Sequence, residues 1–317
     1  MIRRHRILVI GRNGQLAKAL AATEWPSLTS LHFAGRDEID LFHPLRLRQQ
    51  IGAIDPEIII NTAGYARVDL AEQEPEAAFA LNAIAVDNLA KTAAMLDLPL
   101  IHHSSAHVFA GDKAAPYREN DRTEPTTVYG QSMLAGEAAI RRAHGRHLIL
   151  RSSRFFGGYG SNFLKTLLAL GRSADALEFA ANGYACPTPV EALAATIPHI
   201  AVAMIEGRRF PSTLHYAGNA AASWYEIAGE VFTLAGKIQP VPAISPAANS
   251  CVDGAAPRIW NLALDCSLAR SLGLPQINWR ASLPATIEAL CANDALGQEQ
   301  LMPESSPAFS LAALHAA

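Results

Sequence analysis

The chain has 317 residues, half of them hydrophobic, and a formal net charge of -3. A chain of this size can bury a large core in one big domain or in two cooperating lobes. Its charge balance gives no electrostatic reason to expect a nucleic acid or an anionic membrane surface as its main partner.

The cysteines and the N-terminus predict a cytoplasmic protein without a membrane span. The four cysteines are widely spaced with no Cys-x-x-Cys pair, which favours free thiols over a disulfide framework or a zinc site; they are Cys186, Cys251, Cys266 and Cys291. The basic N-terminus precedes an apolar run too short for a secretory signal, and eighteen consecutive apolar residues occur nowhere. We expect no metal, because no His, Asp and Glu cluster has ligand spacing.

Short apolar segments with strand character alternate with segments of helical period. The predicted strands are 7–10, 31–34, 58–61, 100–103 and 148–151, and the helical stretches between them include 15–22, 75–96 and 129–144. This alternation predicts an α/β fold with a parallel, doubly wound Rossmann sheet and right-handed crossovers.

The pattern loosens from about residue 157, which predicts a second and smaller lobe over the carboxyl ends of the strands. We expect an NAD(P)-binding Rossmann domain over 1–156, completed by elements within 188–217. A small substrate-binding lobe would comprise 157–187 and 218–290. The weakly patterned residues 291–317 are expected to form a mobile tail.

A glycine-rich turn joins the first predicted strand to the first predicted helix. Glycines let the backbone turn tightly and approach a pyrophosphate, which then rests on the helix N-terminus. This context predicts nucleotide binding, with a plain structural turn as the alternative. The residues of the turn are Gly11, Arg12, Asn13, Gly14, Gln15 and Leu16.

Two arginines near this turn favour NADPH over NADH. No acidic residue ends the second predicted strand to take a ribose 2′-hydroxyl; Gly35 and Arg36 follow it instead. Arg12 lies in the glycine turn itself, and two guanidiniums can hold a 2′-phosphate. The alternative is that both arginines are solvated surface charges.

Further motifs follow in order along the chain, at 11–16, 38–41, 61–72, 104–109, 129–137, 151–153, 162–163, 187–188 and 224–225. Over roughly residues 6–290 they resemble the dTDP-4-dehydrorhamnose reductase family of the extended short-chain dehydrogenase/reductases. The resemblance implies hydride transfer from NAD(P)H to a 4-keto-6-deoxy nucleotide sugar, and a homodimer is compatible with it. It places Asp40 and Leu41 beside the adenine, and Ala63, Gly64 and Tyr65 along the cofactor.

The resemblance assigns the catalytic roles and shows that one member is missing. Ser105 stands where the family's hydroxyl donor to the ketone belongs, and Tyr129 where its proton donor belongs. Met133 replaces the family's lysine one helical turn after the tyrosine. Without that cation a phenol keeps a pKa near ~10, and the loss could slow the reaction on the order of 10²-fold. The structural alternative is that Ser105 satisfies backbone at a strand end and Tyr129 is a half-buried helix residue.

Two other positions depart from the family's pattern near this site. Where the family has Thr-Asp-Tyr, the chain has Ser105, Ala106 and His107. His107 is a candidate catalytic residue, because in an extended strand it would share a face with Ser105; a buried structural imidazole is the alternative. Arg154 stands where the family usually has Trp, and is a candidate replacement cation or a ligand of a substrate phosphate or carboxylate. The structural alternative is that it only pairs with a neighbouring acid.

The small lobe carries the other candidate substrate ligands. The family's arginine-rich anchor for the nucleotide diphosphate is reduced to Arg258, while Asn162 lies in a matching segment. Trp224 could stack on a base, with lobe packing as the alternative. The function predicted is therefore that of an NADPH-dependent nucleotide-sugar reductase with an altered and weakened site. A non-catalytic nucleotide-binding or regulatory pseudoenzyme is the alternative, and a non-redox lyase or isomerase is a third interpretation.

Overall fold

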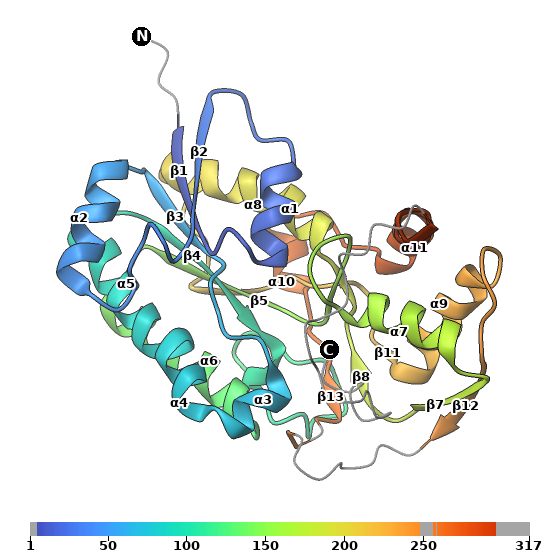
Figure 1. Cartoon of the computed structure of the whole chain (residues 1–317). Helices are drawn as coiled ribbons and strands as arrows, with labels where there is room; N and C mark the ends of the chain where they lie inside the picture. Colours follow the sequence, from blue (N-terminus) through green and yellow to red (C-terminus); the bar gives the residue numbers. More distant parts are fainter. Residues whose placement is uncertain (1–4, 248–255, 258, 296–317) are drawn as a thin grey trace.

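The computed structural model describes residues 5–247, 256–257 and 259–295, and a six-stranded sheet forms its centre (Figure 1). The strand order is β10-β5-β4-β3-β1-β2, and every neighbouring pair is parallel. The predicted doubly wound α/β sheet is thus confirmed, and it contains all five predicted strands. The strands are β1 (His5–Ile10), β2 (Thr29–Ala34), β3 (Ile58–Asn61), β4 (Leu100–Ser105), β5 (His147–Ser152) and β10 (Thr213–His215).

Helices cover both faces of this sheet because side chains along each buried strand alternate between the faces. Ile7 and Val9 of β1 pack with α1 (Gln15–Ala22) and α8 (Val190–Ile205). Leu8 and Ile10 pack on the other face in a cluster whose helical members come from three helices. These are α2 (Pro44–Ile54), α5 (Ala85–Met95) and α6 (Val128–Ala143).

The chain order of the strands reverses around β1, which lies between β2 and β3. In open α/β sheets a ligand binds in the crevice outside the carboxyl ends of the strands at such a point. The glycine turn follows β1 and residues 62–65 follow β3, so both border this crevice. Gly11 has a φ of +100°, and a Cβ there would lie 2.7 Å from the backbone nitrogen of Ala63. Only glycine allows this close approach without strain.

A second core lies beside the sheet, on the side of Figure 1 that carries α7 and α9. Phe163, Phe179 and Trp224 are buried in it. Its main elements are α7 (Phe163–Ser173), β7 (Ala176–Ala180), α9 (Trp224–Ala235), β12 (Ala243–Ala247) and α11 (Trp279–Ala295). Short strands connect it to the sheet domain; they are β6 (Phe155–Phe156), β8 (Tyr184–Ala185), β9 (Thr188–Pro189), β11 (Ala222–Ser223) and β13 (Asn261–Leu262).

Several elements differ from the predicted ones. The helical stretch predicted over 75–96 is divided into α4 (Pro75–Phe79), a π-helical turn η1 (Ala80–Ile84) and α5. Helix α11 continues through 291–295, which are the first residues of the predicted tail. Residues 296–317 and Arg258 lie outside the described residues. The remaining helices are α3 (Val68–Gln73), η2 (Ala106–Val108) and α10 (Ser267–Ser271).

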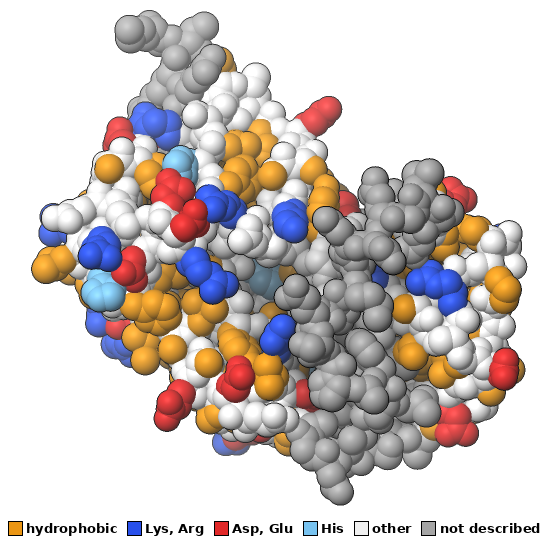
Figure 2. All heavy atoms as spheres, viewed as in Figure 1, with side chains coloured by type: hydrophobic (Ala, Val, Ile, Leu, Met, Phe, Trp, Pro, Cys, Tyr) orange, Lys and Arg blue, Asp and Glu red, His pale blue; other side chains and the backbone are white. Residues whose placement is uncertain are grey.

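The surface carries charges of both signs. On the face shown in Figure 2, basic and acidic side chains are interspersed between apolar patches over the sheet domain. Within the described ranges, no helix combines the length and the hydropathy needed to cross a membrane. The same residues contain no group of three His, Cys, Asp or Glu side chains placed to hold a metal ion.

Candidate active site

The glycine turn leads directly into the N-terminal end of α1. The Gly14 amide donates to the Gly11 carbonyl at 2.9 Å, and Gly14 is the extended N-cap residue of α1. No side chain from the described part of the chain caps this helix end, so its first amides can receive an anion. Asn13 is exposed, whereas Leu16 is buried in the core and supports the turn from beneath.

Gln15 connects the same helix to the second core. Its side-chain amide donates to the Ser161 carbonyl at 2.7 Å, and its Cγ would lie 2.7 Å from a Cβ added at Gly160. Asn162 donates to the Gly157 carbonyl at 3.0 Å and caps α7 by accepting from the Lys165 amide. The proposed substrate ligand Asn162 is therefore buried in a loop that adjoins the glycine turn.

The residues expected around the adenine end form local pairs. Arg12 donates to the Asp37 carboxylate at 2.6 Å, while Arg36 is exposed. The Asp40 carboxylate accepts from the Phe42 amide and also lies near cationic neighbours, which holds its pKa below the usual value. Leu41 is buried in the sheet core. The sequence analysis did not predict that Asp37 pairs with Arg12, although Asp37 directly follows Arg36.

Residues 63–65 are held in place by a buried asparagine that sequence reasoning missed. Asn82, in the π-helical turn η1, accepts from the Tyr65 amide at 2.7 Å and donates to the Tyr65 carbonyl at 3.0 Å. It also donates to the Ser132 hydroxyl at 2.9 Å. The Ser132 hydroxyl in turn donates to the Tyr129 carbonyl at 2.7 Å. A hydrogen-bond chain thus joins the loop after β3, which includes Ala63 and Gly64, to helix α6.

Tyr129 and Ser105 lie together at the carboxyl end of β4. Burial raises the pKa of the Tyr129 phenol, and its hydrogen bond with the Ser105 side chain opposes this shift. Met133 is 5 % exposed and belongs to the same apolar cluster as Tyr129, Val108 and Phe109. The phenol is therefore protonated at neutral pH and can donate its proton, but its own helix supplies a thioether where a cation would stabilise the phenolate.

His107 lies near this pair, but not by the geometry that the sequence suggested. The expectation of an extended strand was wrong, because β4 ends at Ser105 and residues Ala106–Val108 form a 3₁₀ turn. The Ser105 hydroxyl accepts from the His107 amide at 3.2 Å and so caps the turn. The His107 ring meets the Tyr129 ring edge to face, with centroids 5.3 Å apart. His107 therefore contacts Tyr129 from a 3₁₀ turn and not from an extended strand.

The His107 imidazole is neutral at physiological pH. Burial, together with the positive charge of Arg154, lowers its pKa to about 3. Its Nδ1 is buried and makes no hydrogen bond within the described part of the chain. This nitrogen can therefore accept or donate one hydrogen bond, according to its tautomer, without adding a charge.

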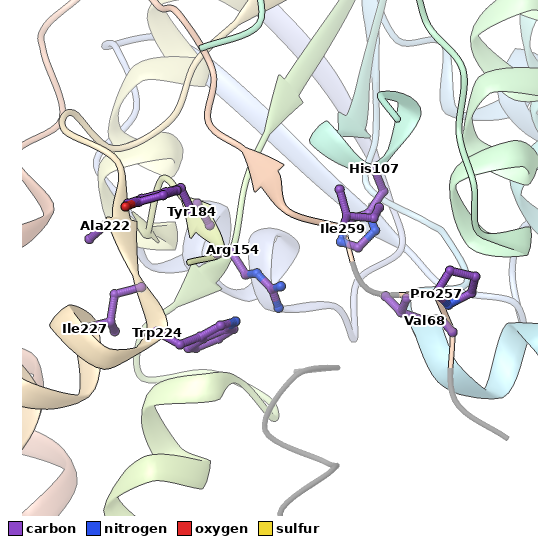
Figure 3. A pocket seen from close by; sticks show the side chains of 12 residues that line it. Val68, His107, Arg154, Tyr184, Ala222, Trp224, Ile227, Pro257 and Ile259 are labelled. Atoms are coloured by element: carbon purple, nitrogen blue, oxygen red, sulfur yellow. The ribbon is translucent and has the colours of Figure 1, made fainter. Parts of the chain in front are cut away.

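A pocket next to His107 brings together residues from both cores (Figure 3). The Arg154 guanidinium projects into it from the segment after β5 and stacks over the Trp224 ring at 4.5 Å. Trp224 is 6 % exposed and also packs edge to face against Phe163. The other lining residues are small or mostly apolar: Val68, Gly183, Tyr184, Ala185, Ala222, Ile227, Ala256, Pro257 and Ile259.

The predicted site residues fall into three regions. Two of them are neighbours, and the third lies away from the cluster around Tyr129. The glycine turn and residues 63–65 border the crevice. Ser105, His107 and Tyr129 form a cluster whose pocket side holds Arg154 and Trp224. Arg36 and Asp40 follow β2 in the sequence, and among the described residues neither contacts the cluster around Tyr129.

The chain is similar in sequence to a known protein family and to characterised members of it. Residues 5–292 match the family model described as RmlD substrate binding domain. A dTDP-4-dehydrorhamnose reductase of Sinorhizobium fredii is 37 % identical over 302 residues, which cover 90 % of this chain and 97 % of that protein. The enzyme of the same name from Escherichia coli K12 is 33 % identical over 234 residues, covering 73 % and 78 % of the two chains.

A solved structure extends the similarity to three dimensions. The crystal structure of dTDP-4-dehydrorhamnose reductase from Bacillus anthracis, in complex with NADP, aligns with a TM-score of 0.82 at 28 % identity. The alignment covers 90 % of this chain and 99 % of that one. The similarity thus includes both the sheet and the second core.

Proposed function

The chain belongs to the dTDP-4-dehydrorhamnose reductase family, and we propose that it is an NADPH-dependent reductase of a 4-keto-6-deoxy nucleotide sugar. The observation that carries the proposal is the buried Ser105–Tyr129 pair at the carboxyl end of β4. A protonated phenol next to a hydroxyl can polarise a carbonyl oxygen and then protonate it.

We infer that a dinucleotide binds at the carboxyl ends of β1 and β3. We place the pyrophosphate on the uncapped N-terminus of α1, where Gly11 keeps the backbone open to it. The cofactor would supply a hydride to the carbonyl carbon. The residues proposed to hold it are Gly11, Arg12, Asn13, Gly14, Gln15, Leu16, Arg36, Asp40, Leu41, Ala63, Gly64 and Tyr65.

The proton steps follow from the site's own residues. Ser105 would hydrogen-bond the ketone oxygen, and Tyr129 would transfer its phenolic proton to that oxygen. The reduction leaves a phenolate, which burial destabilises and Met133 cannot neutralise. We therefore propose a slow reductase, with His107 as a neutral hydrogen-bonding partner of the substrate and with Arg154 and Trp224 on the substrate side. Asn162 instead supports its own loop, because its side chain bonds the Gly157 carbonyl and the Lys165 amide. The role predicted for Arg258 stays a prediction from the sequence.

A non-catalytic nucleotide-binding protein is the second candidate, and the buried thioether of Met133 beside Tyr129 is the observation that favours it. Both candidates are compatible with NADPH binding. The three described cysteines are free thiols, which supports a reducing, cytoplasmic location in either case.

Turnover separates the two candidates. The oxidation of NADPH would be followed with dTDP-4-dehydrorhamnose as substrate, for the native protein and for Tyr129→Phe. We expect slow oxidation by the native protein and none by the variant, with NADPH affinity unchanged by calorimetry. Tight NADPH binding with equal, background oxidation in both proteins would support the non-catalytic candidate instead.

A further inference from the structure

We propose that Lys165 and Asn162 are positioning residues for the cofactor: by binding backbone carbonyls of the loop 157–162, they let this loop lie against the pyrophosphate of the dinucleotide. This inference rests on the proposed function, because it concerns the cofactor of the same reaction. It adds the loop 157–162 to the glycine turn and residues 63–65 as a third part of the proposed cofactor site.

The loop 157–162 precedes α7 and lies next to the start of α1 (Figure 1). Gln15, the first residue of α1, donates from its side-chain amide to the Ser161 carbonyl at 2.7 Å. A Cβ added at Gly160 would lie 2.7 Å from the Cγ of Gln15. Since the pyrophosphate is proposed to bind at the N-terminus of this helix, the loop would border it directly.

The five carbonyls of residues 157–161 all accept hydrogen bonds from side chains. Asn162 donates to two of them, Lys165 to another two and Gln15 to the fifth. The contacts are Asn162 to Gly157 at 3.0 Å and to Tyr159 at 3.4 Å, Lys165 to Gly158 at 2.8 Å and to Gly160 at 2.9 Å, and Gln15 to Ser161 at 2.7 Å.

These contacts matter because a carbonyl oxygen carries a partial negative charge and repels a phosphate. An oxygen that accepts from an ammonium or an amide of the protein is directed at that donor and not at a bound anion. Lys165 and Asn162 therefore remove four unfavourable groups from the side of the loop that would meet the pyrophosphate.

The amides of the same loop suit an anion. The Gly158 amide donates to the Glu191 carboxylate at 3.0 Å. The next three amides, those of residues 159–161, have no hydrogen-bond acceptor in the part of the chain that the structure describes. Gly160 has a φ of +60°, and successive amides around a left-handed residue can bind an anion.

The alternative is that both side chains only stabilise the second core. Asn162 also caps α7, since its side chain accepts from the Lys165 amide. A purely structural role would lower the stability of the protein and weaken every nucleotide to the same extent. A positioning role would weaken only those nucleotides that carry a pyrophosphate.

The test compares 2′-phospho-ADP-ribose with adenosine 2′-phosphate, which lacks the 5′-diphosphoribose and so has no pyrophosphate. Each would be titrated calorimetrically into the full chain. We expect Lys165→Met to lower the affinity for 2′-phospho-ADP-ribose by about 10-fold, roughly the value of a hydrogen bond to a charged group. Its affinity for adenosine 2′-phosphate should stay native. Lys165→Arg keeps a charged donor and should retain most of the native affinity.

Asn162→Ser is a second variant that protects the fold. A serine still offers a capping oxygen to α7 but has no amide to donate to the carbonyls. We expect the same selective loss of affinity for 2′-phospho-ADP-ribose, smaller than that of Lys165→Met.

Lys18→Met is the matched control for charge. Lys18 is an exposed residue of α1 itself, so its loss removes the same charge from the proposed pyrophosphate helix. It should leave both affinities native, and circular dichroism would establish that each variant is folded. A Lys165→Met variant that keeps its affinity for 2′-phospho-ADP-ribose, or that loses affinity for both nucleotides alike, would overturn the inference. So would an equally large loss in Lys18→Met.

A turnover measurement keeps this inference separate from the proposed activity. If 2′-phospho-ADP-ribose binding depends on Lys165 but the native protein does not reduce dTDP-4-dehydrorhamnose, the positioning role stands and the proposed reductase fails. If the native protein reduces that sugar and Lys165→Met does so with the same KM for NADPH, the positioning role fails and the reductase stands.

Discussion

The immediate neighbours of Tyr129 determine how well it can function as an acid. Met133 lies one helical turn away in the same apolar cluster, so the phenolate that the proposed reduction would form has a thioether, not a cation, as its neighbour on this helix. We expect Met133→Lys to raise the rate of reduction by about 10- to 100-fold, because an ammonium there would stabilise the phenolate. Stopped-flow measurement of NADPH oxidation would test this.

Met133→Gln is the control for polarity without charge, and it should give no comparable gain. The lysine variant should also unfold at a lower temperature, since the methionine side chain is 5 % exposed and a buried ammonium is destabilising. If Met133→Lys folds and binds NADPH with native affinity yet gains no activity, the explanation given for Met133 is wrong.

Arg12 and Asp37 form a charge pair that should determine the choice of dinucleotide. Arg12→Ala would remove a proposed ligand of the 2′-phosphate, and it would also remove the guanidinium that lies 2.6 Å from the Asp37 carboxylate. We expect the NADPH-to-NADH affinity ratio to fall by about 10-fold or more, since the freed carboxylate repels a phosphate and accepts from a ribose hydroxyl. Exposed Arg36→Ala should have a smaller effect. If calorimetry gives the native NADPH-to-NADH affinity ratio for both variants, Arg12 and Arg36 do not determine the choice of dinucleotide.

At the scale of elements, a buried ion pair fastens helix α6 to the sheet. Glu137 of α6 receives two hydrogen bonds from Arg151 of β5, at 2.8 and 2.6 Å, and one from Ser104 of β4 at 2.6 Å. The side chains of Glu137 and Arg151 are 0 % and 1 % exposed. Burial opposes ionisation of Glu137, but Arg151, Ser104 and Arg141 together lower the pKa of the carboxyl below its usual value.

Glu137→Gln should therefore destabilise the fold by about 3–5 kcal/mol, because it leaves a buried guanidinium uncompensated. Glu230→Gln is the control: its partner Arg280 is also at 2.6 Å, but both side chains are about a third exposed or more. We expect that change to alter stability by less than about 1 kcal/mol. Urea unfolding of the two variants would measure the difference, and similar losses in both would contradict it.

The elements differ in how far the sequence could predict them. The central strands were predictable, because strands such as 58–61 are covered on both faces and read as continuous apolar runs. The turn of Ala106–Val108 was not, because it depends on the Ser105 hydroxyl accepting from the His107 amide. The role of Asn82 was also hidden, since its partners Tyr65 and Ser132 are distant in sequence. Such contacts exist only after α6 has packed against η1.

For the whole molecule, the two cores are joined at the cofactor crevice as well as at the pocket. Gln15 of α1 contacts Ser161 in the loop before α7, and Arg154 after β5 stacks on Trp224 at the start of α9. Helix α1 is also the proposed pyrophosphate site. A cofactor on α1 and a sugar at Trp224 would thus be bound on opposite sides of the boundary between the two cores, and the proposed catalytic cluster lies at this boundary.

Buried and half-buried histidines make the whole fold sensitive to acid. Burial lowers the pKa of His102 and His215 to about 4, and that of His103 and His107 to about 3. Above pH ~6.5 these histidines are neutral in both the folded and the unfolded chain, so they give stability no pH dependence. Below pH ~6.5 these histidines bind protons in the unfolded chain but not in the folded chain. The free energy of unfolding therefore decreases as the pH is lowered, until the pKa values of the folded chain are reached.

The expected slope is up to about 1.4 kcal/mol per pH unit for each of the four groups. Urea midpoints measured between pH 7.5 and pH 5 would show a plateau followed by a steep decline. His103→Gln should reduce the number of protons taken up on unfolding by about one, and so make the decline shallower. The reason is that His103 is held neutral between Ser152 and Phe155. His199→Gln is the control, since that side chain is exposed and its loss should leave the slope unchanged. A urea midpoint that stays constant down to pH 5 would mean that the buried imidazoles are not linked to unfolding.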